Sequence, residues 1–253
     1  MRRALMAVAG ALVLAATFVV SEASPAAAAG GLSPAEKKEI EQIVREYLLA
    51  NPDVLVDSLR VYEERQRKTA EKDARGAIAA NRDDLERDGA SPVAGNPQGD
   101  VTVVEFFDYR CGYCKKALPA IQELLKSDPK VRWVFRDFPI LGQDSVVAAQ
   151  YALAAWTVAP DKYLPFHVAL MESRGEMTEP RVLEIARKVG LDINKLKQAR
   201  ENPEVKDKID RTYDLARKLQ INGTPAFIVG SQLIPGAVDL ATLRQLVAAA
   251  RAG

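Results

Sequence analysis

The segment from Val101 to Cys114 reads VTVVEFFDYRCGYC, and it decides the fold of the chain. Its first seven residues are rich in β-branched and aromatic side chains, which is typical of a buried central strand. The CGYC sequence at its end is expected to open a helix that runs to about Lys126. We therefore predict a strand-to-helix junction that carries two cysteines in the first turn of the helix.

The sequence on both sides of this junction predicts an α/β domain over residues 91–253. A second strand-like run lies at 131–135, and several helical patterns fill about 144–219. A strand hairpin around Gly230 follows, and a closing helix covers 239–250. Strands and helices in this order indicate one sheet with helices packed on it.

The first 29 residues resemble a secretory signal. Arg2 and Arg3 precede an apolar stretch, and the alanines at 27–29 offer a cleavage site. We expect residues 1–29 to be removed and the rest to reach a Gram-negative periplasm. Disulfide bonds are chemically permitted in that compartment.

We predict an N-terminal helical segment at residues 30–72. Residues 73–90 are expected to form a helical or flexible connector. Ser33 and Glu36 form the pattern of a helix N-cap, and apolar residues then recur on one helical face. A single apolar stripe needs a partner, which is either another copy of the segment or the main domain. We favour self-association, which makes residues 30–72 an oligomerisation segment.

Composition excludes several classes of function. The 253 residues carry 35 Lys and Arg against 34 Asp and Glu, so the basic excess of a typical nucleic-acid-binding protein is absent. We expect no nucleic-acid partner. Two cysteines and one histidine also leave little scope for a zinc finger or a multi-histidine metal centre.

The pair Cys111 and Cys114 carries the chemistry. Helix N-termini favour a thiolate, and a CxxC spacing lowers the pKa of the first thiol. Cys111 would attack a substrate disulfide, and Cys114 would resolve the mixed disulfide. The same pair could instead be half of a zinc site, a copper(I) clamp, or a structural disulfide.

A second motif, Gly223-Thr-Pro-Ala-Phe227, precedes the late strand. Because Pro225 cannot donate a ladder hydrogen bond, it belongs at a strand edge or in a turn. If the bond between Thr224 and Pro225 is cis, the neighbouring backbone could lie open beside the cysteines. Most X-Pro bonds are trans, so the sequence leaves the isomer open.

Together, EFFDYRCGYC at 105–114 and GTPAF at 223–227 resemble the DsbA family of thioredoxin-fold proteins. The resemblance implies a thioredoxin fold with an all-helical insertion, and no cofactor besides a redox-active Cys111–Cys114 disulfide. It also implies that Cys111 is the nucleophile, Cys114 the resolving cysteine and Pro225 the cis-proline that follows Thr224. Glu105 matches a buried carboxylate that takes protons from the resolving cysteine, although a salt-bridged core residue would give the same pattern.

The residues between the cysteines bear on the direction of the reaction. Strongly oxidising members of the family carry a Cys-Pro-His-Cys sequence. The sequence here, with Gly112 and Tyr113 between the cysteines, instead resembles that of the bacterial disulfide isomerases of the DsbC type. Residues 48–55 resemble the stalk of suppressor-of-copper-sensitivity C proteins, some of which trimerise. By implication, the protein is a trimeric periplasmic enzyme that acts on exported proteins and is kept reduced by a DsbD-like membrane reductase.

Three functional hypotheses follow. The first is an oligomeric disulfide isomerase or reductase that acts on misfolded or oxidised exported proteins. The second is a DsbA-like dithiol oxidase, against which Tyr113 counts. The third is a copper(I)-sequestering protein that binds the ion at Cys111 and Cys114 and contributes to copper tolerance.

Overall fold

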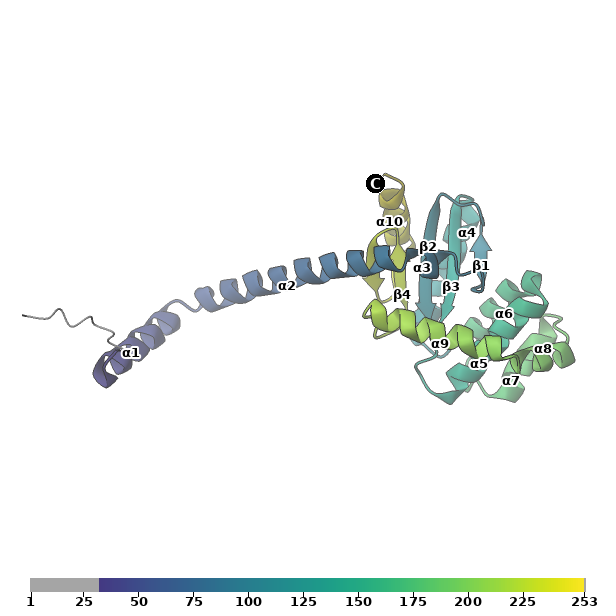
Figure 1. The fold of residues 1–253 in the computed structure, drawn as a ribbon, viewed down its shortest axis with the longest axis horizontal. Coiled ribbons are helices and arrows are strands. Elements are labelled where there is room, and N and C mark those ends of the chain that lie inside the picture. The colour runs from purple at the N-terminus through teal and green to yellow at the C-terminus, as the bar shows by residue number, and fades with distance from the viewer. Residues whose placement is uncertain (1–31, 253) are drawn as a thin grey trace, which may run out of the picture. The chain divides into compact units, whose positions relative to one another are not determined.

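The computed structural model describes residues 32–252, and the chain divides into two compact units, Met1–Leu59 and Arg60–Gly253 (Figure 1). The expected signal sequence at residues 1–29 lies outside the described part of the chain. Each unit is described below by itself.

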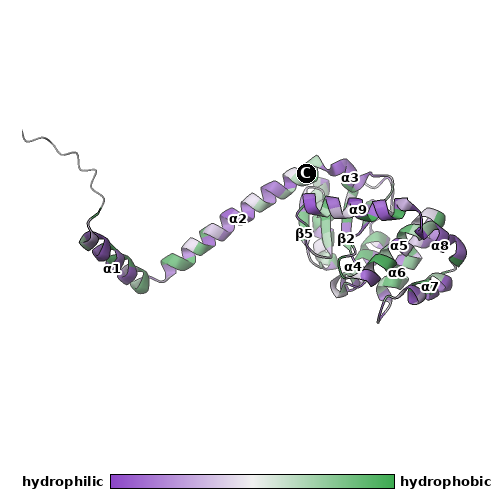
Figure 2. Ribbon diagram, turned by 60° about the horizontal axis from the view of Figure 1, so that its bottom comes forward, coloured by the Kyte–Doolittle hydropathy of each residue, from purple (hydrophilic) through white to green (hydrophobic). Residues whose placement is uncertain are grey.

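The first unit contains helix α1 (Pro34–Ala50) and the start of helix α2 (Asp53–Ala80). Ser33 caps α1: its hydroxyl accepts from the backbone N–H of Glu36, and the Glu36 carboxylate accepts from the backbone N–H of Ser33. No residue of α1 is buried. Figure 2 shows hydrophobic and hydrophilic residues interspersed along α1 and α2, and among the described residues the large apolar side chains of Ile43, Val44 and Tyr47 on α1 are exposed.

The second unit is built on a five-stranded sheet in the order β1-β3-β2-β4-β5. Strands β2 and β3 are parallel, and the other neighbouring pairs are antiparallel. Strand β2 is central and almost wholly buried, as its apolar sequence predicts. The strands are β1 (Val93–Gly95), β2 (Val101–Phe107), β3 (Val131–Asp137), β4 (Ala226–Val229) and β5 (Gln232–Pro235).

Helices cover both faces of the sheet. One face packs against α4, α6 and α10, and the other against the end of α2, α3 and α9. Helices α5, α7 and α8 extend the first of these cores beyond the sheet (Figure 1). The helices of this unit after α2 are α3 (Arg82–Glu86), α4 (Gly112–Ser127), α5 (Gln143–Val158), α6 (Pro160–Glu172), α7 (Glu179–Lys188), α8 (Ile193–Arg200), α9 (Pro203–Lys218) and α10 (Leu240–Ala252).

This arrangement confirms the predicted thioredoxin fold. Helices α5 to α9 form the all-helical insertion and lie between the β2-α4-β3 half and the β4-β5-α10 half. Within residues 73–90, the chain contains the end of α2 and all of α3, and it buries Ile78 and Leu85. The division into 30–72, 73–90 and 91–253 remains a prediction.

Among the described residues, none of the helices combines the length and the apolar character that a membrane crossing requires.

Candidate active site

The two cysteines lie where β2 passes into α4. Cys111 is the N-cap residue of α4 with extended backbone angles, and Cys114 lies in the first turn. Both are free thiols, with Cys111 6% and Cys114 1% exposed. The N-terminal backbone N–H groups of α4 therefore point toward the more exposed sulfur.

Hydrogen bonds strongly favour the thiolate form of Cys111. The thiol of Cys114 makes the largest contribution, and Thr224 and the backbone N–H groups of Tyr113 and Cys114 add to it. Together they outweigh the cost of burial and lower the pKa of Cys111 from 9.0 to about 5. Cys111 is thus ionised at neutral pH, whereas the Cys114 pKa is raised by its hydrogen bond with Cys111, by burial and by Glu105.

The GTPAF motif lies beside the cysteines, as expected. The peptide bond between Thr224 and Pro225 is cis, and the Cys111 sulfur lies 3.1 Å from the carbonyl oxygen of Thr224. The backbone N–H of Gly236 donates to the carbonyl oxygen of Pro225 at 2.8 Å. The chain between Cys111 and Pro225 is thus folded so that the proline lies next to the nucleophile.

Glu105 lies inside the sheet beneath the cysteines. It is 1% exposed and pairs with Phe135 of β3. The indole Nε1–H of Trp133 donates to its carboxylate at 3.1 Å. Burial raises the pKa of Glu105 to about 8, so the group can hold or release a proton near neutral pH. The carboxylate forms no salt bridge among the described residues; the alternative of a salt-bridged core residue therefore loses support.

Asp108 is a buried residue of the site that the sequence analysis did not single out. Its Oδ1 accepts from the backbone N–H of Arg110 at 2.7 Å and from the hydroxyl of Ser145 at 2.8 Å. Its Oδ2 accepts from the backbone N–H of Leu141 at 3.0 Å. One carboxylate therefore fixes the turn before Cys111, the loop after β3 and the first turn of α5.

His167, the single histidine of the chain, lies in the core against four aromatic rings. Its Nδ1 lies 3.1 Å from the hydroxyl oxygen of Tyr109. Burial lowers the pKa of His167 to about 3, so the imidazole is neutral. Its contacts are those of a packing residue.

The described residues include no cluster of three or more His, Cys, Asp or Glu side chains that could hold a metal ion. A copper(I) ion at this site would therefore have only the two cysteine sulfurs as ligands. Two thiolates suit a soft monovalent ion, which accepts low coordination numbers.

Comparison with known proteins agrees with this geometry. Residues 102–248 match the family described as "DSBA-like thioredoxin domain". The chain belongs to this family. Residues 36–68 match the family described as "Copper resistance protein ScsC N-terminal domain", as the resemblance of residues 48–55 suggested.

Two solved structures show the same relationship. A thioredoxin-like oxidoreductase from Silicibacter pomeroyi is 50% identical, with a TM-score of 0.66 over 68% of this chain and 99% of that chain. A linker-deletion variant of ScsC from Proteus mirabilis is 28% identical, with a TM-score of 0.68 over 88% of this chain and 99% of that chain. The second match extends the likeness into the N-terminal helices.

Curated relatives match somewhat less than two thirds of this chain. A Na(+)/H(+) antiporter NhaA 1 from Salinispora arenicola is 31% identical over 64% of this chain, but the match spans only 25% of that protein. Disulfide bond formation protein D from Bacillus subtilis is 28% identical over 62% of this chain and 75% of that protein. The chain thus spans about a quarter of the length of the antiporter it matches.

Proposed function

We propose that the protein is a periplasmic thiol–disulfide oxidoreductase that works mainly as a disulfide isomerase or reductase on exported proteins. The observation that carries the proposal is that the pKa values of the two neighbouring thiols are shifted in opposite directions. Cys111 is a thiolate at a helix N-terminus beside a cis-proline, and Cys114 stays protonated behind it. This is the arrangement that nucleophilic thiol exchange needs.

The proposed reaction begins when the Cys111 thiolate attacks a substrate disulfide. One substrate sulfur leaves as a thiolate, and a mixed disulfide forms with Cys111. For isomerisation, a second substrate thiolate attacks that mixed disulfide and releases Cys111. For reduction, Cys114 passes its proton to Glu105, attacks Cys111 and expels the substrate thiolate.

The degree of thiolate stabilisation supports isomerase or reductase activity over oxidase activity. Reference pKa values for the nucleophile are about 3.5 in DsbA and about 7 in thioredoxin. Cys111, with a pKa of about 5, lies between them. The side chain of Tyr113, at the position of the histidine in the strongly oxidising pattern, is 63% exposed and points away from the core. The resulting disulfide is less oxidising than one with a fully stabilised thiolate.

The N-terminal helices support an oligomer, and we favour a trimer. Ile43, Val44 and Tyr47 form an apolar stripe on α1 and are each at least half exposed. Such a stripe is typical of a helix that packs on other copies. Several active sites in one assembly could hold a misfolded protein during repeated exchange.

The test is refolding of scrambled ribonuclease by chain 30–253 in a redox buffer that keeps part of Cys111 reduced. The variant Ile43→Asp places a charge in the apolar stripe, and Gln42→Asp places the same charge beside it as a matched control. We expect the native chain and the control to be oligomeric and to restore activity. We expect Ile43→Asp to be monomeric and several-fold slower. If none of the three unscrambles ribonuclease but all oxidise the reduced enzyme, the oxidase function takes the place of the proposal.

We further propose that a DsbD-like membrane reductase keeps Cys111 and Cys114 reduced. Copper(I) sequestration is the second candidate, because both thiols lie together and residues 36–68 match a domain family named for copper resistance. Sequestration predicts that one equivalent of copper(I) blocks thiol titration and that ribonuclease stays scrambled. Exchange activity that persists with copper(I) chelated would favour the oxidoreductase.

A further inference from the structure

The proposed mechanism does not use Asp137, a buried acid of the domain. Asp137 ends β3 and is 2% exposed, and neither of its carboxyl oxygens has a hydrogen-bond partner among the described residues. Burial of a carboxyl group without partners destabilises a fold. A group of this kind therefore calls for an explanation other than stability.

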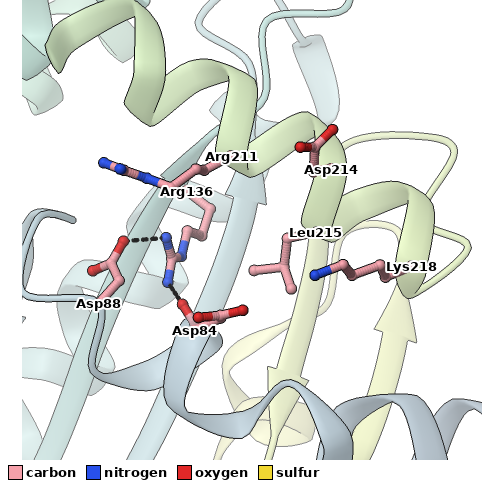
Figure 3. Close-up of a pocket in the computed structure, with 7 residues that line it drawn as sticks. All are labelled: Asp84, Asp88, Arg136, Arg211, Asp214, Leu215 and Lys218. Atoms are coloured by element: carbon pink, nitrogen blue, oxygen red, sulfur yellow. Dashed lines mark hydrogen bonds and ion pairs between the residues drawn. The ribbon is translucent and has the colours of Figure 1, made fainter.

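The adjacent residue shows that the same strand can satisfy a buried charge. Side chains alternate across a strand, so Arg136 points to the opposite face from Asp137. The guanidinium of Arg136 bonds Asp88 at 2.5 Å and the carbonyl oxygens of Asp84 and Leu85. Figure 3 shows this cluster at a cavity of about 120 Å³ next to α9. Arg136 thus anchors α3 to the sheet, whereas Asp137 anchors nothing.

Asp137 shares its face of the sheet with Glu105. In the parallel pair of β2 and β3, Glu105 lies beside Phe135, and Phe107 lies beside Asp137. The hydrogen bond from Trp133 to Glu105 confirms that side chains at 133, 135 and 137 point the same way as Glu105. Strand spacing and rise place the Cα atoms of the two acids about 8 Å apart.

The groups around Asp137 favour its protonated form, so its carboxylate takes up a proton readily whenever it is ionised. Burial is the main cause that raises its pKa well above the usual value, and the carboxylates of Asp108 and Glu105 raise it further. The backbone N–H of Asp137 itself and, from α9, Lys208 act in the opposite direction but more weakly than burial. The other polar groups of this core, in the β2–α4 turn and on α6, are uncharged near neutral pH: Tyr109, Tyr163 and His167. Two carboxyl groups in such a core cannot both ionise easily.

We infer that Glu105 and Asp137 act as one buried acid pair that receives the Cys114 proton, with Asp137 as its second proton site. The inference rests on the proposed function. When the S–H bond of Cys114 breaks, its electron pair stays on sulfur and the proton joins the singly ionised pair. The Cys114 thiolate then forms the disulfide with Cys111, and the substrate leaves as a thiolate.

The test measures how fast substrate is released from a mixed disulfide with Cys111, as a function of pH. It compares the native chain with Glu105→Gln, Asp137→Asn and the double variant. Glu201→Gln, on an acid 77% exposed, is the matched control. We expect Glu105→Gln to keep a pH-dependent step that is lost in the double variant. We expect the double variant to be at least about tenfold slower than Glu105→Gln at pH 7. Equal rates and equal pH profiles for these two variants would overturn the inference.

The same experiment separates this inference from the proposed function. If the native chain forms no mixed disulfide, the proposed function fails; if only Asp137→Asn is without effect, the acid pair alone fails. Should Asp137→Asn not fold by circular dichroism, carboxyl ¹³C resonances of the native chain give the answer. We expect the carboxyl resonances of Asp137 and Glu105 to shift together between the reduced and oxidised forms. If the chemical shift of the Asp137 carboxyl carbon changes with neither pH nor redox state, the inference is wrong.

Discussion

Helices α1 and α4 are both amphipathic, and they differ in what covers their apolar residues. Helix α4 buries five residues, including Cys114 and Leu124, against the sheet and α6. Helix α1 buries none, although its sequence is rich in large apolar side chains. The difference teaches that the apolar stripe of α4 is covered by its own domain, whereas the stripe of α1 is left exposed among the described residues, where the proposed oligomer would bury it. The predictions below test this contrast and the hydrogen bonds that support α4.

The largest effect is expected at the start of α4. The variant Cys111→Ser should lower the rate of disulfide exchange at least about a thousandfold, because a serine hydroxyl is not ionised near neutral pH. The measurement is the rate of mixed-disulfide formation with a peptide disulfide. Cys114→Ser should still form the mixed disulfide and should trap it. A trapped adduct on Cys114 in Cys111→Ser would reverse the assignment of nucleophile and resolving cysteine.

Truncation of one leucine on each helix compares the two environments directly. Leu124 of α4 is 1% exposed, and its replacement by alanine should lower the free energy of unfolding by about 2–5 kcal/mol. Leu49 of α1 is 72% exposed, and its replacement should cost less than about 0.5 kcal/mol in dilute solution. Urea unfolding at two protein concentrations measures both. A cost at Leu49 that grows with concentration would place this leucine within the oligomer interface.

A smaller effect is expected when Asp108 is replaced by Asn. The amide oxygen can still accept from Arg110 and Ser145, but the new NH₂ group would face the N–H of Leu141. An unsatisfied buried donor costs about 1–3 kcal/mol. We expect a loss of stability in that range and faster hydrogen exchange at Leu141. Ser145→Ala is the control, since it removes a different bond to the same carboxylate and should leave the Leu141 amide protected.

The last prediction concerns pH. The pKa of Cys111 is about 5 in the folded chain against a usual value of 9.0, so its thiolate favours folding. This contribution is complete above pH 9 and disappears as the pH falls through 5. The stability of the reduced form relative to the oxidised form should therefore rise between pH 5 and pH 9. Thermal melts of both forms across this range measure it, and a flat difference would contradict the thiolate assignment.

Local sequence patterns were enough to predict much of this molecule. The CGYC motif and the strand before it lie in short segments whose residue types favour their conformation, whereas the cis bond in the GTPAF motif was implied only by the family resemblance. The structure brings Cys111 and Thr224 together as the resemblance implied. The predicted N-cap at Ser33 is also confirmed.

Contacts between distant segments were not predictable from local patterns. Asp108 bonds Leu141 and Ser145, more than thirty residues away, and no periodicity encodes such a bond. Asp137 is an ordinary acidic residue in the sequence, and only the register of β3 against β2 shows that it lies beside Glu105 in the core. The burial of Ile78 near the end of α2 likewise depends on the packing of the sheet.

The hydrogen bond between Trp133 and Glu105 has a practical consequence. Trp133 is one of two tryptophans in the chain and is fully buried, and its indole N–H donates to the acid proposed to receive the resolving proton. A change in the charge of Glu105 alters the electric field at the indole ring. The emission of this tryptophan should therefore change with each proton that reaches the acid, so the protein carries its own optical reporter of turnover.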